Sequence, residues 1–211
     1  MEILSKISEA VLDGDTKNII SYCQAAVENE IPAGDILKKG LIAGMNEVGV
    51  LFKEGEMFVP EVLVSAKALQ LGVDALSHYL KEEGVDVIGK IVTVTVEGDL
   101  HDIGIKLVGI MLEGAGFEVI NLGVDKKATE IIAKIKELKP DILAMSAMLT
   151  TTMGKMEEVI SLLREERLSE HLKIMVGGAP LSPVYAERIG ANFSPDASSA
   201  VDVAKKLLNV A

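Results

Sequence analysis

Three short segments hold the residues of this chain that are best suited to binding chemistry. The first, residues 98–104, contains His101, with Asp99 two residues before it and Asp102 directly after it. A carboxylate that accepts a hydrogen bond from one imidazole nitrogen leaves the other nitrogen as an electron-pair donor, as in many metal-binding histidines. The segment therefore predicts a histidine ligand that is oriented by a carboxylate.

The second and third segments carry small and hydroxylated residues. Residues 145–152 include Ser146 and the run Thr150–Thr152, whose hydroxyl groups can donate to acceptor atoms in a pocket. Residues 176–180 include the pair Gly177–Gly178, which lets the backbone approach a bulky group closely. The segments contain no second histidine or cysteine, so a metal bound here would have to bring most of its own ligands.

Each segment follows a run of residues typical of a buried strand. The strand-like runs alternate with patterns typical of helices, which predicts an α/β flavodoxin-like fold with a five-stranded parallel sheet in the order 2-1-3-4-5. In that fold ligands bind in a crevice that opens at the carboxyl ends of strands one and three. The three segments follow strands one, three and four, so we expect them to converge on that crevice. The expected strands are 90–96, 118–121, 141–145, 173–176 and 191–194, and the expected helices are 104–115, 127–138, 153–168, 181–189 and 196–209.

The N-terminal third has a different pattern, because its apolar residues recur at helical spacing and only short turns interrupt them. This pattern predicts a bundle of about four helices. The polar run at residues 81–86 contains a glycine and marks the expected boundary. We therefore expect a mixed architecture, with a helical domain at residues 1–84 and an α/β domain at residues 90–211.

Composition limits the classes of partner. The formal net charge is −11 and aromatic residues make up only 3% of the chain, which argues against binding nucleic acid. A single cysteine, Cys23, excludes an internal disulfide and fits a reducing compartment. No run approaches an uninterrupted membrane span, and no secretory leader is recognisable. We expect a cytoplasmic protein that binds no membrane.

Two other interpretations of His101 can be weighed. A lone loop histidine is often merely solvated, but Asp99 two residues away argues against this interpretation. The string His101-Asp102 also matches the core of metal-dependent HD phosphohydrolases. Those sites need further ligands on helices, and the helices upstream of this string offer only His78.

Together the segments resemble the signature of base-off cobalamin-binding domains, Asp-x-His-x-x-Gly, Ser-x-Leu and Gly-Gly. Asp99, His101 and Gly104 match its first element, Ser146 matches the second with Met148 in place of leucine, and Gly177–Gly178 match the third. The N-terminal third resembles the helical cap of methionine synthase. The matching residues there are Gly44–Met45, Val48–Gly49, Phe52, 56–61 and Ser65–Ala66.

The resemblance implies roles for individual residues. His101 would be the lower axial ligand of cobalt and would displace the base of the cofactor, while Asp99 would bind its second nitrogen and Thr150 or Thr152 would complete the polar network. Ser146 would bond the displaced base. Met57, Phe58 and Val62 of the cap would cover the corrin, or they belong to the ordinary core of the helical bundle. The expected cofactor-binding residues are Gly98, Asp99, His101, Asp102, Ile103, Gly104, Ser146, Met148, Leu149, Thr150, Thr152, Gly177 and Gly178, and His101 is the expected metal ligand.

A cap and a cobalamin domain of this length resemble the corrinoid protein of a methyltransferase system. Such a protein is a carrier that has no activity alone: as cob(I)alamin it takes a methyl group from a substrate-specific methyltransferase, and as methylcob(III)alamin it passes the group to a second methyltransferase that serves tetrahydrofolate or a thiol. A reductive activator is a further implied partner. The donor, which could be a methylamine, methanol, a betaine or an aryl methyl ether, stays open because its pocket would lie on another polypeptide.

Three other functions were weighed against this one. Subunits of adenosylcobalamin mutases usually lack a helical cap, and a cobalamin-dependent transcription regulator would need a basic DNA-binding segment. A module resembling a response regulator would bind no cofactor. We therefore expect a corrinoid methyl carrier.

Overall fold

The computed structural model describes residues 2–85 and 87–210. Asp86, which belongs to the expected linker, lies outside the described residues. The chain divides into two compact units, and each is described by itself. The first comprises the residues up to Val87 and Gly114–Gly116, and the second comprises Ile88–Glu113 and the residues from Phe117 onward.

The first unit is a helical bundle. Its buried apolar residues include Ile7 on α1, Cys23 on α2 and Leu76 on α5, all at most 1% exposed, so helices far apart in sequence share one core. A short α-helix, a π-helical segment and a longer α-helix follow one another directly between α2 and α5. The elements are α1 (Glu2–Leu12), α2 (Ile19–Glu28), α3 (Ala33–Asp35), η1 (Ile36–Ile42), α4 (Ala43–Glu54) and α5 (Val59–Glu82).

The ends of α5 follow from local chemistry. At its start the Glu61 carboxylate accepts a hydrogen bond of 2.8 Å from the Phe58 N–H, a backbone group that the helix itself does not satisfy. At its end Gly84 adopts a left-handed φ of 63°. The expected linker at residues 81–86 is therefore wrong at its beginning, because α5 runs through Glu82. The next residue, Glu83, accepts 2.7 Å from the Ala33 N–H at the start of α3.

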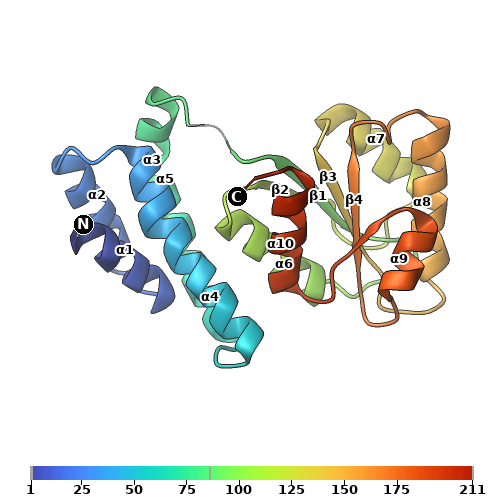
Figure 1. Ribbon diagram of the computed structural model, residues 1–211, viewed down its shortest axis with the longest axis horizontal. Helices are drawn as coiled ribbons and strands as arrows, with labels where there is room; N and C mark the ends of the chain where they lie inside the picture. Colours follow the sequence, from blue (N-terminus) through green and yellow to red (C-terminus); the bar gives the residue numbers. More distant parts are fainter. Residues whose placement is uncertain (1, 86, 211) are drawn as a thin grey trace. The chain divides into compact units, whose positions relative to one another are not determined.

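The second unit is a parallel sheet with the order β2-β1-β3-β4-β5. This confirms the expected fold class of a helical region followed by a five-stranded parallel α/β sheet (Figure 1). Its strands are β1 (Lys90–Thr95), β2 (Glu118–Asn121), β3 (Ile142–Ser146), β4 (Lys173–Gly177) and β5 (Asn192–Phe193), and its helices are α6 (Ile103–Gly114), α7 (Ala128–Leu138), α8 (Met153–Glu165), α9 (Pro183–Ile189) and α10 (Ala197–Leu207).

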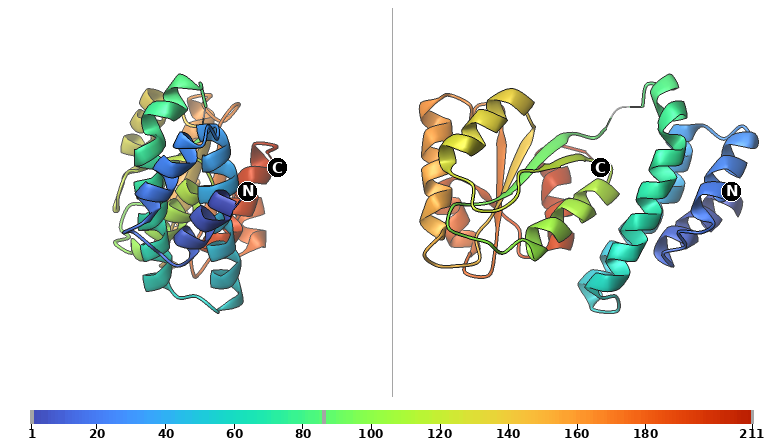
Figure 2. Two further views of the ribbon diagram at one scale, coloured as in Figure 1. Left: turned by 90° about the vertical axis from the view of Figure 1, so that its left-hand side faces the viewer. Right: turned by 180° about the vertical axis from the view of Figure 1, so that it is seen from behind.

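The two faces of the sheet differ in character. Val92, Val94 and Val96 belong to a branched aliphatic core that includes residues of α7, α8 and α9. The alternate residues of the strands point to the other face, which α6 and α10 cover (Figures 1 and 2). Toward the carboxyl ends of β1, β3 and β4 that face presents small or hydroxylated side chains, among them Thr95, Ser146 and Gly177, whereas Ile91 and Ile142 lie at its other end.

Two elements near the C-terminus, β5 and α9, are shorter than the sequence indicates. The expected strand 191–194 is reduced to Asn192–Phe193, and the expected helix 181–189 begins only at Pro183. The later start has a local cause, because the Ser182 side chain accepts a hydrogen bond of 3.2 Å from the Tyr185 N–H and so caps α9. Neither change moves the carboxyl ends of β1, β3 and β4.

Candidate cofactor-binding site

Asp99 is the centre of a buried hydrogen-bond network at the carboxyl end of β1. Its side chain is fully buried and accepts four hydrogen bonds. Oδ1 accepts from the His101 N–H at 3.0 Å and lies 2.7 Å from His101 Nδ1. Oδ2 accepts from the Met148 N–H at 2.6 Å and from the Thr152 hydroxyl at 3.0 Å. The first and second segments are thus joined through one carboxylate.

The charge of Asp99 determines which nitrogen of His101 carries the proton. Burial alone would raise the pKa of Asp99, but hydrogen bonds from the Met148 N–H, the His101 N–H, the His101 ring and the Thr152 hydroxyl outweigh it and hold this pKa at about 2. At neutral pH the carboxylate can only accept hydrogen bonds, so Nδ1 of His101 carries the hydrogen. In the neutral imidazole Nε2 then holds the free electron pair.

His101 presents that nitrogen at the surface. The ring is 58% exposed although its carboxylate partner is fully buried. The loop backbone is held too, because the Thr95 hydroxyl donates to the His101 carbonyl oxygen at 3.1 Å. The side chain is therefore fixed in direction by its neighbours and remains open to a ligand. This is the arrangement that the spacing of Asp99 and His101 predicts.

Asp125 is a further member of the site that the sequence did not reveal. It lies on the loop after β2, and its carboxylate accepts a hydrogen bond of 2.7 Å from the Gly98 N–H. Its own N–H donates to the Asp99 carbonyl oxygen at 3.1 Å. Asp125 has a left-handed φ of 53°, which is strained for a residue with a side chain. This unusual conformation places its two hydrogen bonds on the backbone groups that flank the Gly98–Asp99 segment, the Gly98 N–H and the Asp99 carbonyl oxygen.

The third segment packs directly against the second. The Ala147 N–H donates to the Gly177 carbonyl oxygen at 3.2 Å. A Cβ atom at Gly178, which has a φ of 138°, would overlap the Ala147 carbonyl oxygen. Gly178 is therefore required by the fold itself. Ser146, at the end of β3, is 7% exposed and pairs in register with Thr95 and Gly177.

The other predicted residues are distributed around the same edge of the sheet. Thr152, and not the exposed Thr150, completes the network behind Asp99. Asp102 forms an ion pair of 2.5 Å with Lys106 and takes no part in that network. Large apolar side chains are exposed beside the histidine, namely Leu100 (71%), Ile103 (73%), Met148 (37%) and Leu149 (41%).

Gly104 differs from the other predicted residues because no other described part of the fold packs against it. A Cβ atom at this position would have no protein atom within 4 Å, so nothing in the described part of the chain requires a glycine there. Its φ also lies outside the left-handed region. A glycine that the fold does not need, beside exposed apolar side chains, indicates room for a bulky apolar ligand.

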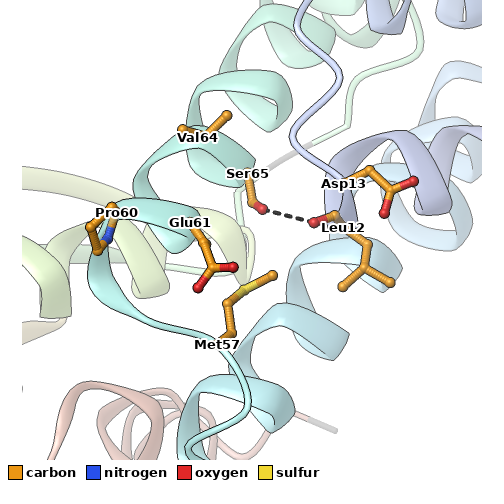
Figure 3. A pocket seen from close by; sticks show the side chains of 7 residues that line it. All are labelled: Leu12, Asp13, Met57, Pro60, Glu61, Val64 and Ser65. Atoms are coloured by element: carbon orange, nitrogen blue, oxygen red, sulfur yellow. Dashed lines mark hydrogen bonds between the residues drawn. The ribbon is translucent and has the colours of Figure 1, made fainter.

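The expected cap residues lie in three different environments. Phe58 is 66% exposed, as a covering residue would be. Val62 is fully buried in the core of the helical unit, so the expectation that it covers a cofactor is wrong. Met57 lines a pocket of about 450 Å³ between the end of α1 and the start of α5 (Figure 3), together with Leu12, Asp13, Pro60, Glu61, Val64 and Ser65.

The donor groups of the described residues limit the kind of metal site. Between residues 2 and 85, and between 87 and 210, no group of three or more His, Cys, Asp or Glu side chains could hold a metal ion. A metal at Nε2 of His101 would therefore lack a set of three such side chains and would need further ligands from a cofactor. Within the same residues, none of the helices has both the length and the apolar character needed to cross a bilayer.

Comparison with known proteins gives matches over nearly the whole chain. Residues 3–77 and 89–201 each match a family described as a B12 binding domain. A corrinoid protein of Desulfitobacterium hafniense is 42% identical over 99% of this chain and 98% of its own length. Dimethylamine corrinoid protein 1 of Methanosarcina acetivorans is 42% identical over 98% of both chains.

Comparison with solved structures also gives matches to cobalamin-related proteins over nearly the whole chain. The methanol:cobalamin methyltransferase complex of Methanosarcina barkeri contains a chain that matches with a TM-score of 0.87 and 28% identity, over 99% of this chain and 80% of that one. A cobalamin-binding protein from D. hafniense matches with a TM-score of 0.80 and 33% identity, over 97% and 98% of the two chains. Both matches include the helical unit as well as the sheet.

Proposed function

Because this chain belongs to the cobalamin-binding corrinoid proteins of methyltransferase systems, we propose that it carries a methyl group on cobalamin bound in the base-off form, with His101 as the lower axial ligand. In this proposal the chain moves the group between two methyltransferases and has no activity alone. The observation that carries the proposal is the exposed His101 ring, whose Nδ1 lies 2.7 Å from a fully buried carboxylate.

The residues present fit a corrinoid in three respects. Nε2 of His101 is the free ring nitrogen, and Leu100 and Ile103 expose apolar surface beside it for a large macrocycle. Gly104 leaves space that the fold does not use. At the carboxyl end of the sheet face under α6 and α10 the side chains are small, among them Ser146 and Gly177, as the entrance of a slot for a displaced base would need.

When it is bound, the cobalt of the cofactor supplies the centre that accepts and releases a methyl group. The chain holds and tunes that centre. Asp99 stabilises positive charge on the His101 ring, whether the charge comes from a bound cation or from a proton on Nε2. Thr152 and the Met148 N–H keep Asp99 ionised by donating to Oδ2, so the ring keeps its Nδ1 hydrogen and its direction.

The base slot has its own set of residues in this proposal. The Ser146 hydroxyl donates to a nitrogen of the displaced base, and Gly177 and Gly178 let the nucleotide tail pass close to the backbone. Met148 and Leu149 line the entrance of the slot with apolar surface. These assignments rest on the motif match and on the exposure of the side chains.

The relatives support a methyltransferase as a partner of this chain. The chain is 42% identical to a protein named for dimethylamine and 28% identical to a chain of a methanol enzyme complex. This difference favours a methylated amine as the donor, held by a separate methyltransferase. The second methyltransferase passes the group to tetrahydrofolate or a thiol, and a reductive activator restores the cofactor after accidental oxidation.

The test is the identity of the nitrogen that binds cobalt. The full chain, labelled with ¹⁵N at histidine, is loaded with cobalamin and reduced to the Co(II) state for electron paramagnetic resonance. We expect hyperfine coupling to one ¹⁵N nucleus, and its loss in His101→Ala. His171→Ala is the matched control, because His171 is the other histidine of the α/β unit and is also exposed. Coupling to the unlabelled benzimidazole nitrogen in the wild type would contradict the proposal.

A further inference from the structure

The pocket between the end of α1 and the start of α5 combines apolar walls with negative charge. Its volume is about 450 Å³, and its apolar surface comes mainly from Leu12, Met57 and Val64 (Figure 3). The carboxylates of Asp13 and Glu61 line it as well, and none of its seven lining residues is basic. A ligand that suits this pocket therefore has an apolar body and a positive charge.

The polar side chains of the pocket are hydrogen-bond acceptors. Ser65 is 1% exposed, and its hydroxyl donates its hydrogen to the Leu12 carbonyl oxygen at 3.1 Å, so only its oxygen remains to accept (Figure 3). Glu61 accepts from the Phe58 N–H with Oε2, which leaves Oε1 for another donor. A ligand held by these groups must itself donate the hydrogen bond.

The end of α1 adds to the preference for a cation. Leu12 is the last residue of this helix and lines the pocket, so the negative end of the helix dipole lies there. The last turn of α1 has no basic residue that would offset this charge. On the other wall, the positive end of α5 is already capped by the Glu61 carboxylate. The helix ends therefore reinforce the two carboxylates.

The wall that carries Asp13 is held by the fold. The Asp13 N–H donates to the Glu9 carbonyl oxygen at 2.8 Å, and the next residue, Gly14, has a left-handed φ of 65°. A Cβ atom at Gly14 would lie 2.5 Å from Cγ1 of Val64, so this turn packs directly against α5. The pocket is thus formed by the packing of the helical unit and needs no ligand to assemble it.

We propose that this pocket binds a small alkylammonium ion of the methylated amine class, with its positive nitrogen toward the two carboxylates and its methyl groups against the apolar wall. The ion would bridge α1 and α5 and so stabilise the helical unit. A lysine side chain carries a similar alkylammonium group, so the experiment separates these two sources. The inference requires no cobalamin and is independent of the role of His101.

The test separates the contribution of charge from that of apolar surface. The full chain, labelled with carbon-13 in the methyl groups of methionine and valine, is titrated with trimethylammonium chloride, ammonium chloride and tert-butanol at constant ionic strength. Ammonium has the charge without the methyl groups, and tert-butanol has similar bulk without the charge. Trimethylammonium should shift the Met57 and Val64 signals with a dissociation constant in the millimolar range, and the other two should bind at least roughly tenfold more weakly. The signal of Met156, which is fully buried in the α/β unit, should not move.

Substitutions show whether the two carboxylates hold the ion. Asp13→Asn and Glu61→Gln should each weaken the binding of trimethylammonium about threefold, and the double variant about tenfold. The glutamine oxygen can still accept from the Phe58 N–H, so α5 keeps its start. Glu9→Gln is the matched control, because Glu9 is an exposed carboxylate of α1 that does not line the pocket. This variant should bind trimethylammonium as tightly as the wild type.

Three results would overturn the inference. Ammonium or tert-butanol could bind as tightly as trimethylammonium, or the double variant could keep the affinity of the wild type. In a further titration, a lysine blocked at both backbone ends could bind more tightly than trimethylammonium, in which case the pocket takes a side chain of a partner protein and not a methylated amine. None of these results affects the proposed function, because the paramagnetic resonance experiment tests the ligand of cobalt separately.

Discussion

Asp125 and Gly98 are 27 residues apart in sequence, and the carboxylate of the first accepts a 2.7 Å hydrogen bond from the N–H of the second. The N–H of Asp125 donates to the carbonyl oxygen of Asp99. Asp125 thus holds the backbone at both ends of the Gly98–Asp99 segment, which carries the carboxylate that orients His101. It touches neither His101 nor a ligand, so its contribution is to position the loop.

This arrangement predicts a difference between two substitutions at Asp125. Asp125→Asn keeps an oxygen acceptor and tolerates the left-handed conformation, so it should change the free energy of unfolding by less than ~1 kcal/mol. Asp125→Ala loses the hydrogen-bond acceptor and retains the strain of the left-handed backbone conformation. It should reduce the free energy of unfolding by about 2 kcal/mol. Urea unfolding measures both values.

A second measurement shows whether the loop itself is affected. In Asp125→Ala the Gly98 amide hydrogen should exchange faster, and cobalamin should bind more weakly than in Asp125→Asn. If the alanine and asparagine variants have equal stability and equal affinity, the two hydrogen bonds of Asp125 do not position the site.

The pKa of Asp99 predicts how the stability of the chain depends on pH. The folded pKa is about 2 and the ordinary value is 3.8, so as pH falls the unfolded state binds a proton first. Ionised Asp99 therefore contributes stability that is complete above about pH 4 and is lost between about pH 4 and pH 2. The contribution amounts to roughly 2 kcal/mol.

Other carboxylates titrate in the same range, so the measurement is a difference between two proteins. The free energy of unfolding is measured from pH 6 to pH 2 for the wild type and for Asp99→Asn. The difference in free energy of unfolding between the wild type and Asp99→Asn should be constant above about pH 4. It should become smaller as the pH falls toward 2. An advantage that stays constant over the whole range would show that the folded chain does not hold Asp99 at a lowered pKa.

Thr152 gives a prediction about the network behind the histidine. Its hydroxyl lies 3.0 Å from Asp99 Oδ2 and 2.9 Å from the Leu149 carbonyl oxygen, so two acceptors compete for one hydrogen. Thr152→Val removes that donor, which should raise the pKa of Asp99 and reduce the free energy of unfolding by about 1 kcal/mol. Thr152→Ser keeps the donor. A carbon-13 titration of the Asp99 carboxyl group that is the same in both variants would contradict this role.

The spacing of residues along the chain was enough to predict the structural features that depend only on residues close together in sequence. The run of β-branched residues before Asp99 indicated a strand, and the short Asp99–His101 separation indicated their hydrogen bond. The role of Asp125 depends instead on how the loop after β2 pairs with the end of β1, where Val96 forms a bridge to Lys126. That register belongs to the tertiary structure, and only a comparison of all the strand ends at one edge could have suggested it.

Two further differences between the sequence predictions and the structure also arise from tertiary packing. Thr150 and Thr152 are equivalent in the sequence pattern, and the turn before α8 decides which hydroxyl group faces Asp99. Val62 directly follows a motif that resembles a cap, yet the rotation of α5 places it in the helical core. A motif shows which residues occur together, whereas the direction of each side chain depends on the packing of its helix.

Gly104 and Gly178 test whether a glycine is present for the fold or for the cofactor. A Cβ atom at Gly178 would overlap the Ala147 carbonyl oxygen at a φ of 138°, so Gly178→Ala should cost about 2 kcal/mol or more without any cofactor. Gly104 lies in α6 with open space around it, so Gly104→Ala should leave the free chain as stable as the wild type or up to ~1 kcal/mol more stable. Its affinity for cobalamin should nevertheless fall roughly tenfold or more, because the added methyl group meets the corrin. Urea unfolding of the free chains and spectroscopic titration with cobalamin measure the two effects separately, and a Gly104→Ala protein with unchanged affinity would show that the corrin does not lie against α6.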